Sequence, residues 1–165
     1  MFEEILGIPA HALLVHAAVI FVPLQVAVAI AYSLVPWARR NIGWLVVTLA
    51  IVGPLTAWFA RLSGEALRTR MAGQGVTDFT KIDQHSGYSA YAWYFSMALG
   101  LLMILLVIVR GKPGLVDGYT GEPKSGGSPV VNGLLVVLTL AAAGATGYYI
   151  FKTGDSGAHM VWQGR

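Results

Sequence analysis

Four histidines are the residues in this sequence best suited to hold a cofactor. His11 and His16 open one long apolar segment, His85 opens another, and His159 lies in the C-terminal tail. Imidazole nitrogen is a common ligand of haem iron and of divalent metal ions. His16 lies deepest in its segment, where an ionisable side chain is disfavoured unless it faces the protein interior. We therefore expect His16 and His85 to act as ligands from two facing helices.

Two kinds of cofactor fit these histidines. A b-type haem needs two imidazoles on opposite faces of an apolar slot, and Arg61 and Lys152 would pair with its propionates. The alternative is a zinc, iron or copper ion in a mixed nitrogen and oxygen shell. Its candidate ligands are the histidines and acids near the same end of the chain's helices: His16, His85, Glu65, Asp155, His11 and His159. A third interpretation needs no cofactor. In it, His16 is a bundle histidine whose ring bonds a backbone carbonyl freed by a helix break.

Other chemistries lack the residues they require. The sequence has no cysteine, which excludes disulfides, thiolate ligands and iron–sulfur clusters on this chain. It also has no H-E-x-x-H motif, phosphate loop or nucleophile elbow. We therefore expect a binding or electron-transfer role, with no catalytic residues, rather than an enzyme acting on its own.

The segments that position the histidines are unusually apolar. Of the 165 residues, 56% are hydrophobic and 12% are charged, against about 25% charged residues in soluble domains. The mean hydropathy is +0.64. In such a chain, the net charge of +3 is better explained by basic residues that set membrane topology and attract lipid headgroups than by nucleic-acid binding. We predict an all-α integral membrane four-helix bundle that forms a single transmembrane domain over residues 1–165.

Four apolar segments are long enough to cross a bilayer as helices. They span about 9–35, 42–60, 85–109 and 129–151. Pro23 interrupts the first helix and Gly53-Pro54 the second. Residues 110–128 are rich in Gly, Pro and Lys without apolar periodicity, which predicts a flexible loop. Small residues over 141–147 indicate that the fourth helix packs closely against protein or a flat cofactor.

The two halves of the chain share a pattern. The first and third predicted helices both begin with histidine, and S-G-E-A at 63–66 aligns with T-G-D-S at 153–156. This predicts two related helix hairpins.

Four crossings place both termini on one side. Because nothing basic precedes the first helix and Arg39-Arg40 follow it, we predict a multi-pass protein of the inner (plasma) membrane with both termini outside.

The order of these features resembles the small bacterial membrane proteins grouped as domain of unknown function 2231. The matching stretches are I-P-A-H-A-L-L-V-H-A-A-V-I-F-V-P-L at 8–24, S-G-E-A at 63–66, D-Q-H at 83–85 and T-G-D-S-G-A-H-M-V-W at 153–162. Some members are joined to Rieske-type or cytochrome c domains, so the resemblance implies a place near electron transfer. Members tend to carry histidine where this chain has Asp155, and here His159 follows four residues on.

These observations predict a histidine-containing site near the outer face of the membrane. It would bind haem b or a metal ion for electron transfer in a respiratory-type assembly, with respiratory-complex subunits or a c-type or Rieske redox protein as partners. The alternative is a non-catalytic accessory subunit that packs against a larger membrane complex through its fourth helix. A proton or solute pathway is disfavoured, because the cytoplasmic half offers little polarity beyond Gln25, Ser33 and Thr48.

Overall fold

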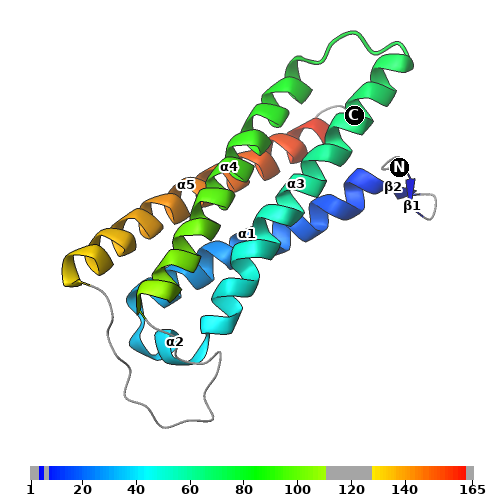
Figure 1. Cartoon of the computed structure of the whole chain (residues 1–165). Coiled ribbons are helices and arrows are strands. Elements are labelled where there is room, and N and C mark those ends of the chain that lie inside the picture. Colours follow the sequence, from blue (N-terminus) through cyan, green and yellow to red (C-terminus); the bar gives the residue numbers. More distant parts are fainter. Residues whose placement is uncertain (1–3, 6–7, 111–127, 163–165) are drawn as a thin grey trace.

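The computed structural model describes residues 4–5, 8–110 and 128–162 (Figure 1). A two-residue hairpin, β1 (Glu4–Ile5) and β2 (Ile8–Pro9), precedes the first helix, with Ile5 opposite Ile8. The helices are α1 (Ala10–Leu34), α2 (Pro36–Asn41), α3 (Gly43–Gly73), α4 (Thr80–Arg110) and α5 (Pro129–Trp162). All but α2 are long and apolar enough to cross a membrane.

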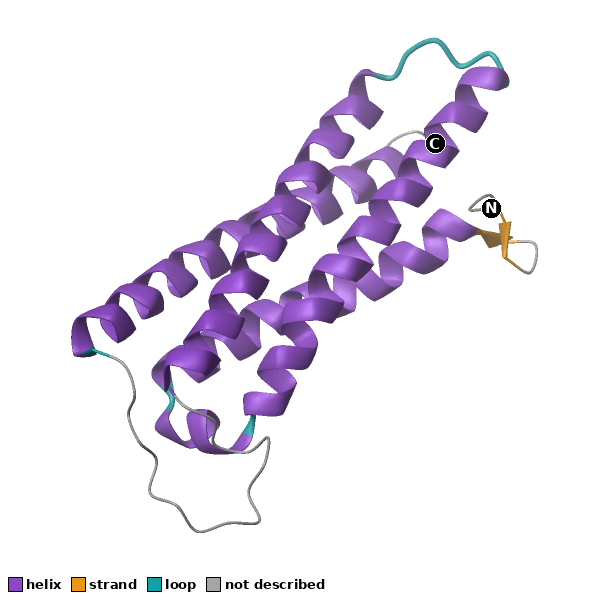
Figure 2. Cartoon of the chain, viewed as in Figure 1, coloured by secondary structure: helices purple, strands orange, loops and turns teal. Residues whose placement is uncertain are grey.

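The four long helices form the all-α bundle that the sequence predicts (Figure 2). α1 packs along α3 and α4 along α5, and the two hairpins meet through α3 against α4 and α1 against α5. The start of α1, the end of α5 and the α3–α4 turn lie at one end of the bundle (Figure 1). We call it the histidine end, after His11 and His85. The opposite end, which carries α2, Arg39 and Arg110, is the arginine end.

Three helices extend beyond the predicted membrane spans at the histidine end. α3 continues past residue 60 to Gly73, α4 begins at Thr80 rather than at residue 85, and α5 continues past residue 151 to Trp162. The added turns contact the neighbouring helices, since Ser63 is fully buried and Ser156 is bonded to His85. At the arginine end, the predicted turn is the short helix α2, which begins at Pro36. The predicted flexible loop at 110–128 lies outside the described residues except at its edges.

The α3–α4 turn is closed by a glycine and an ion pair. Gly75 has a φ of 88°, in the left-handed region that glycine adopts without strain after a helix end. Arg68 then pairs with Asp83, with Nε 2.9 Å from Oδ1, and its guanidinium lies 4.6 Å from the centre of the Phe79 ring. This pair is exposed, so it orients the turn more than it stabilises the fold.

α1 and α3 continue through Pro23 and Pro54, so the predicted interruptions are not breaks in either helix. Proline has no N–H, so the carbonyl of Ala50 lacks its usual helical donor. Gly100 of α4 lies directly against that oxygen, and a Cβ at position 100 would overlap it. The backbones of α3 and α4 therefore approach each other where α3 lacks this hydrogen bond, as small residues allow in membrane bundles.

A buried amide joins α1 to α4 at nearly the same level. The side chain of Gln25 is fully buried, and its Nε2 donates to the carbonyl of Ser96 at 3.0 Å. The Ser96 hydroxyl donates back to Gln25 Oε1 at 2.7 Å. Gly53 leaves the space that this amide fills, since a Cβ there would collide with it. Gln25 thus satisfies its hydrogen bonds inside the bundle and opens no polar route toward the arginine end.

The large buried side chains lie in the half of the bundle nearer the arginine end. This cluster contains Val28, Tyr32, Val46, Leu49, Leu99, Met103 and Leu106. Between this cluster and the histidine end, the buried apolar side chains among the described residues are Val22 and three alanines, Ala18, Ala60 and Ala92.

Candidate functional site

His11 of α1 is held against α3 by polar contacts. Its Nδ1 lies 3.1 Å from the carbonyl oxygen of Ala60 and 3.0 Å from the hydroxyl oxygen of Ser63. Ser63 is fully buried, and its hydroxyl donates to the same Ala60 carbonyl at 2.7 Å. A carbonyl only accepts hydrogen bonds, so Nδ1 of His11 must carry a hydrogen.

His85 of α4 is held against α5 in the same way. Its Nδ1 lies 2.9 Å from the hydroxyl oxygen of Ser156. That hydroxyl donates its own hydrogen to the carbonyl of Thr153 at 3.0 Å, so its oxygen is left to accept from His85. The hydrogen of the neutral His85 ring is therefore on Nδ1.

The Nε2 atoms of both rings keep a free lone pair in the neutral form. A bond from Nδ1–H to a carbonyl or hydroxyl oxygen is how proteins orient an imidazole that ligates metal through Nε2. The histidine end thus presents two bases of the same tautomer, one from each hairpin.

Glycines follow both serines and make room for the rings. A Cβ on Gly64 would lie 3.1 Å from Cε1 of His11, and one on Gly157 would lie 3.3 Å from Cε1 of His85. The S-G pair at 63–64 therefore corresponds to the S-G pair at 156–157, and not to T-G at 153–154 as the sequence alignment predicted. The two hairpins do carry the same unit, at a different register. The repeated S-G dipeptide is the signal that identifies these partners.

His16 does not occupy the inward position that its depth predicted. It lies on the exposed side of α1, and its Nδ1 contacts the carbonyl of Ala12 one turn earlier. His11 and His16 are five residues apart, so they point in different directions from one helix. In the structure, His11 makes the contact with α3. Within the described residues, His16 has no partner on another helix.

The predicted acidic ligands form pairs of their own. Glu65 is exposed, with Oε1 3.3 Å from Nε of Arg61 on the preceding turn. Asp155 likewise pairs with His159 on the next turn, where Oδ1 lies 3.3 Å from Nδ1. Over the part of the chain that the structure describes, no three His, Asp or Glu side chains form a group that could hold a metal ion. The proposed six-residue ligand set is not brought together.

The two predicted propionate partners lie on the later turns of α3 and α5. The Arg61 guanidinium sits 5.6 Å from the centre of the Trp93 ring as well as beside Glu65. Lys152 is half-buried on α5. Both positive charges are thus on the helices that hold the serines.

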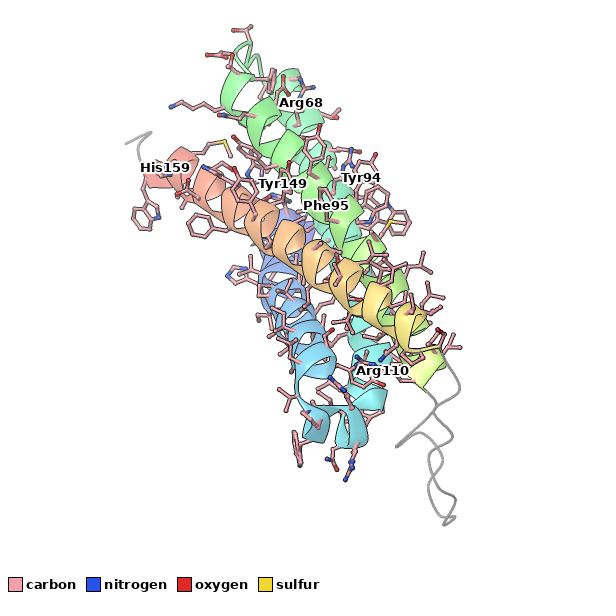
Figure 3. The ribbon with its side chains drawn as sticks, turned by 90° about the vertical axis from the view of Figure 1, so that its left-hand side faces the viewer. Arg68, Tyr94, Phe95, Arg110, Tyr149 and His159 are labelled. Atoms are coloured by element: carbon pink, nitrogen blue, oxygen red, sulfur yellow. The ribbon has the colours of Figure 1, made fainter. Side chains whose placement is uncertain are left out.

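Aromatic stacking fixes α4 against α5 below His85. The ring of Tyr149 stacks on Tyr91 at 5.1 Å and on Phe95 at 5.4 Å between centroids. Figure 3 shows Tyr149 and Phe95 side by side between the two helices. Pairs of this kind each contribute roughly 0.5–1.5 kcal/mol beyond burial. The stack therefore holds the helix pair on which the His85–Ser156 contact depends.

Four membrane-length helices with a polar cap at one end define a multi-pass helical membrane protein. A family model described as predicted membrane protein (DUF2231) matches residues 7–165, so the chain belongs to this family. The match confirms the resemblance found in the sequence. No curated protein and no solved structure matches the chain.

Proposed function

We propose that this protein binds haem b between His11 and His85 and passes electrons within a respiratory-type membrane assembly. The observation that carries this proposal is the shared hydrogen-bonding pattern of the two imidazoles, each bonded through Nδ1 and each left with Nε2 as an acceptor. Hexacoordinate haem iron takes two such nitrogens as axial ligands, while the porphyrin supplies the other four. Two histidines from opposite hairpins are therefore a sufficient ligand set.

The number of available ligands favours haem over a bare metal ion. Structural zinc sites use four protein ligands and catalytic sites three. Among the described residues no group of three is present, and Glu65 and Asp155 are engaged with neighbours on their own helices. A zinc, iron or copper ion held by two imidazoles and water is the weaker form of the same proposal.

The surroundings of the two rings also suit a flat, largely apolar group. Ala18, Ala60 and Ala92 are buried in this half of the bundle, and such short side chains would let a flat group approach the helix backbones. Arg61 and Lys152 supply positive charge for propionates, and Arg61 would exchange its Glu65 partner for one of them. The tight serine and glycine contacts would hold the rings at a fixed orientation.

The proposed orientation places the histidine end at the outer face of the inner (plasma) membrane. Both ends carry basic residues, so the proposal rests on the first helix: nothing basic precedes α1, and Arg39 and Arg40 follow it directly. A c-type or Rieske redox protein on the outer side would then reach the site. Labelling of single cysteines introduced at position 76 and position 40 with an impermeant reagent tests the orientation. Labelling at 40 alone in intact cells would contradict it.

The direct test is the visible spectrum of the purified protein with a matched set of histidine variants. We expect a Soret band that is lost in His11→Ala and in His85→Ala. His16→Ala is the control, because His16 lies on the same helix and has no partner on another one. It should keep the band at full intensity.

Two outcomes would overturn the haem assignment. One is a colourless, metal-free preparation that is fully folded after expression with haem supplied. The other is a band that His16→Ala abolishes and His11→Ala leaves intact. Elemental analysis of the same samples separates haem iron from a zinc or copper ion.

The accessory-subunit role is supported by the outer face of α5. Ala141 and Gly144 are exposed there, and a Cβ on Gly144 would meet nothing within 4 Å. Small residues facing outward allow another membrane helix to approach closely. Gly144→Leu should leave this chain folded and weaken co-purification with a larger complex, while unchanged co-purification would count against this role.

A further inference from the structure

Two arginines converge on the last turn of α1 at the arginine end. Arg39 of α2 donates from its Nη2 atom to the carbonyl of Ser33 at 2.7 Å. Arg110, at the end of α4, donates to the Tyr32 carbonyl at 2.8 Å and reaches the same Ser33 carbonyl at 3.5 Å. The free carbonyls of a helix end attract cations, so this capping explains why the two guanidiniums lie together. Figure 3 shows Arg110 at the junction of α4 with the other helices.

The charges of this pair are not neutralised by the described residues. The described contacts of both guanidiniums are to neutral groups, the α1 carbonyls, the Asn132 amide and the Tyr32 ring. Their positive charges act on one another at this separation. Two guanidiniums held side by side, without an acid between them in the described part of the chain, favour an anion.

Buried donors without acceptors point to the same place. Tyr32 and Ser33 are each 1% exposed, and neither hydroxyl has a hydrogen-bond partner among the described residues. The Nε–H of Arg39 is also buried and has no partner in this part of the chain. An orphaned buried donor costs about 1–3 kcal/mol, and such a group often marks a water or ion. The Tyr32 ring lies beneath the Arg110 guanidinium, with 5.6 Å between Cζ and the ring centre.

We propose that this cluster, defined by Tyr32, Ser33, Arg39 and Arg110, binds the phosphate group of an anionic phospholipid. The cluster lies at the end of the membrane-spanning helices, where headgroups are found. Two large aromatic side chains mark that level, since Trp37 of α2 and Trp44 of α3 are 67% and 53% exposed. A phosphate accepts from both guanidiniums and offers oxygens to the orphaned donors. This proposal is independent of the haem site at the other end of the bundle.

Arg39 and Arg40 offer a matched pair of variants. They are adjacent and carry the same charge, but Arg40 is exposed and Arg39 reaches the Ser33 carbonyl. Arg39→Gln and Arg40→Gln therefore change the net charge equally and alter the cluster only in the first case. Tyr32→Phe is a milder variant, because it removes the orphaned hydroxyl and keeps the ring.

Native mass spectrometry of the detergent-solubilised protein, with phosphatidylglycerol, phosphatidylcholine or inorganic phosphate added, tests the proposal. We expect wild type and Arg40→Gln to retain phosphatidylglycerol over phosphatidylcholine. Arg39→Gln should bind it about tenfold more weakly, and Tyr32→Phe should weaken it to a smaller extent. Circular dichroism on each variant checks that the helices remain.

Several results would overturn the proposal. If Arg39→Gln and Arg40→Gln lose phosphatidylglycerol binding equally, the lipid is attracted by charge alone. If both variants retain it as well as wild type does, the cluster is not a binding site. Inorganic phosphate binding as tightly as phosphatidylglycerol would show that the ligand is not a lipid. Phosphatidylglycerol bound only after Asp117→Asn with Glu122→Gln would show that the chain's own carboxylates fill the cluster.

Discussion

A Cβ atom on Gly64 would lie 3.1 Å from Cε1 of His11, closer than nearly all real side-chain contacts. The glycine sits in the middle of α3, where replacing it by alanine ordinarily stabilises a helix by roughly 0.5–1 kcal/mol. Here the added methyl would press on a ring that is held by Ala60 and Ser63. The requirement for glycine therefore arises from the imidazole and not from the backbone.

We predict that Gly64→Ala fails to gain the helix stabilisation that alanine normally brings. Gly154→Ala on α5 is the control, because a Cβ there meets nothing within 4 Å. The control should be more stable than wild type by about 0.5–1 kcal/mol in denaturant unfolding in micelles. Gly64→Ala should be no more stable than wild type and should reduce the Soret band. Equal stabilisation of both variants would show that the ring is not confined.

Much of this arrangement follows from the sequence, and the limits have physical causes. Apolar length was enough to locate four membrane helices, but the prolines did not predict breaks, because α1 and α3 continue through Pro23 and Pro54. The sequence alone did not predict which of the two imidazoles on α1 faces the interior of the bundle. His11 and His16 lie on different faces of α1, and the choice depends on the approach of α3, which no local pattern specifies.

The ends of α3 and α5 beyond the membrane spans are hard to place from the sequence for a related reason. Residues 61–73 and 152–162 are too polar to be read as membrane spans, and hydropathy ends each helix at the bilayer. The turns continue because Ser63 and Ser156 bond histidines on the neighbouring helices. Tertiary contacts therefore decide the helix ends that hold the candidate site.

The close contact between Gly100 and Ala50 predicts a severe effect of a single methyl group. Gly100→Ala would push a Cβ into a backbone oxygen that cannot move independently of α3. Overpacking of this kind costs about 1–3 kcal/mol, and more where backbone must shift. Gly87→Ala, on the same helix with open space around it, should be neutral or stabilising. Thermal unfolding in micelles separates the two, and equal midpoints would show that α3 and α4 are less tightly packed.

The Gln25–Ser96 pair predicts the cost of an unpaired buried amide. Ser96→Ala removes the hydroxyl that donates to Gln25 Oε1 and leaves that oxygen buried without its donor. We expect a loss of about 1–3 kcal/mol in the free energy of unfolding. Ser89→Ala is the comparison, because Ser89 bonds only the carbonyl of Ser86 on its own helix. If Gln25→Leu with Ser96→Ala costs as much as the sum of the two single variants, the pair is not coupled.

Asp78 gives the start of α4 a defined dependence on pH. Its Oδ1 accepts from the backbone N–H of Thr80 at 3.0 Å, just before the first turn of α4. This bond to the ionised form, followed by a bond to the Thr80 side chain and the nearby charge of Lys81, lowers the pKa of Asp78 below its ordinary value. A lowered pKa in the folded state means that the contact stabilises the turn at pH values above the range in which an aspartate ordinarily titrates. That contribution is lost as pH falls through the folded pKa.

The measurement is the amide resonance of Thr80 and its hydrogen exchange between neutral and acidic pH. In wild type, we expect the protection of the Thr80 amide, relative to its intrinsic exchange rate at each pH, to fall and its resonance to shift at a pH below that at which a free aspartate titrates. Asp78→Asn keeps an oxygen that can accept from Thr80 but cannot ionise, so its Thr80 amide should not follow that titration. An unchanged profile in Asp78→Asn would assign the transition to another carboxylate. Because Asp78 is fully exposed, the effect should stay within the first turn of α4 and leave the bundle's unfolding midpoint unmoved.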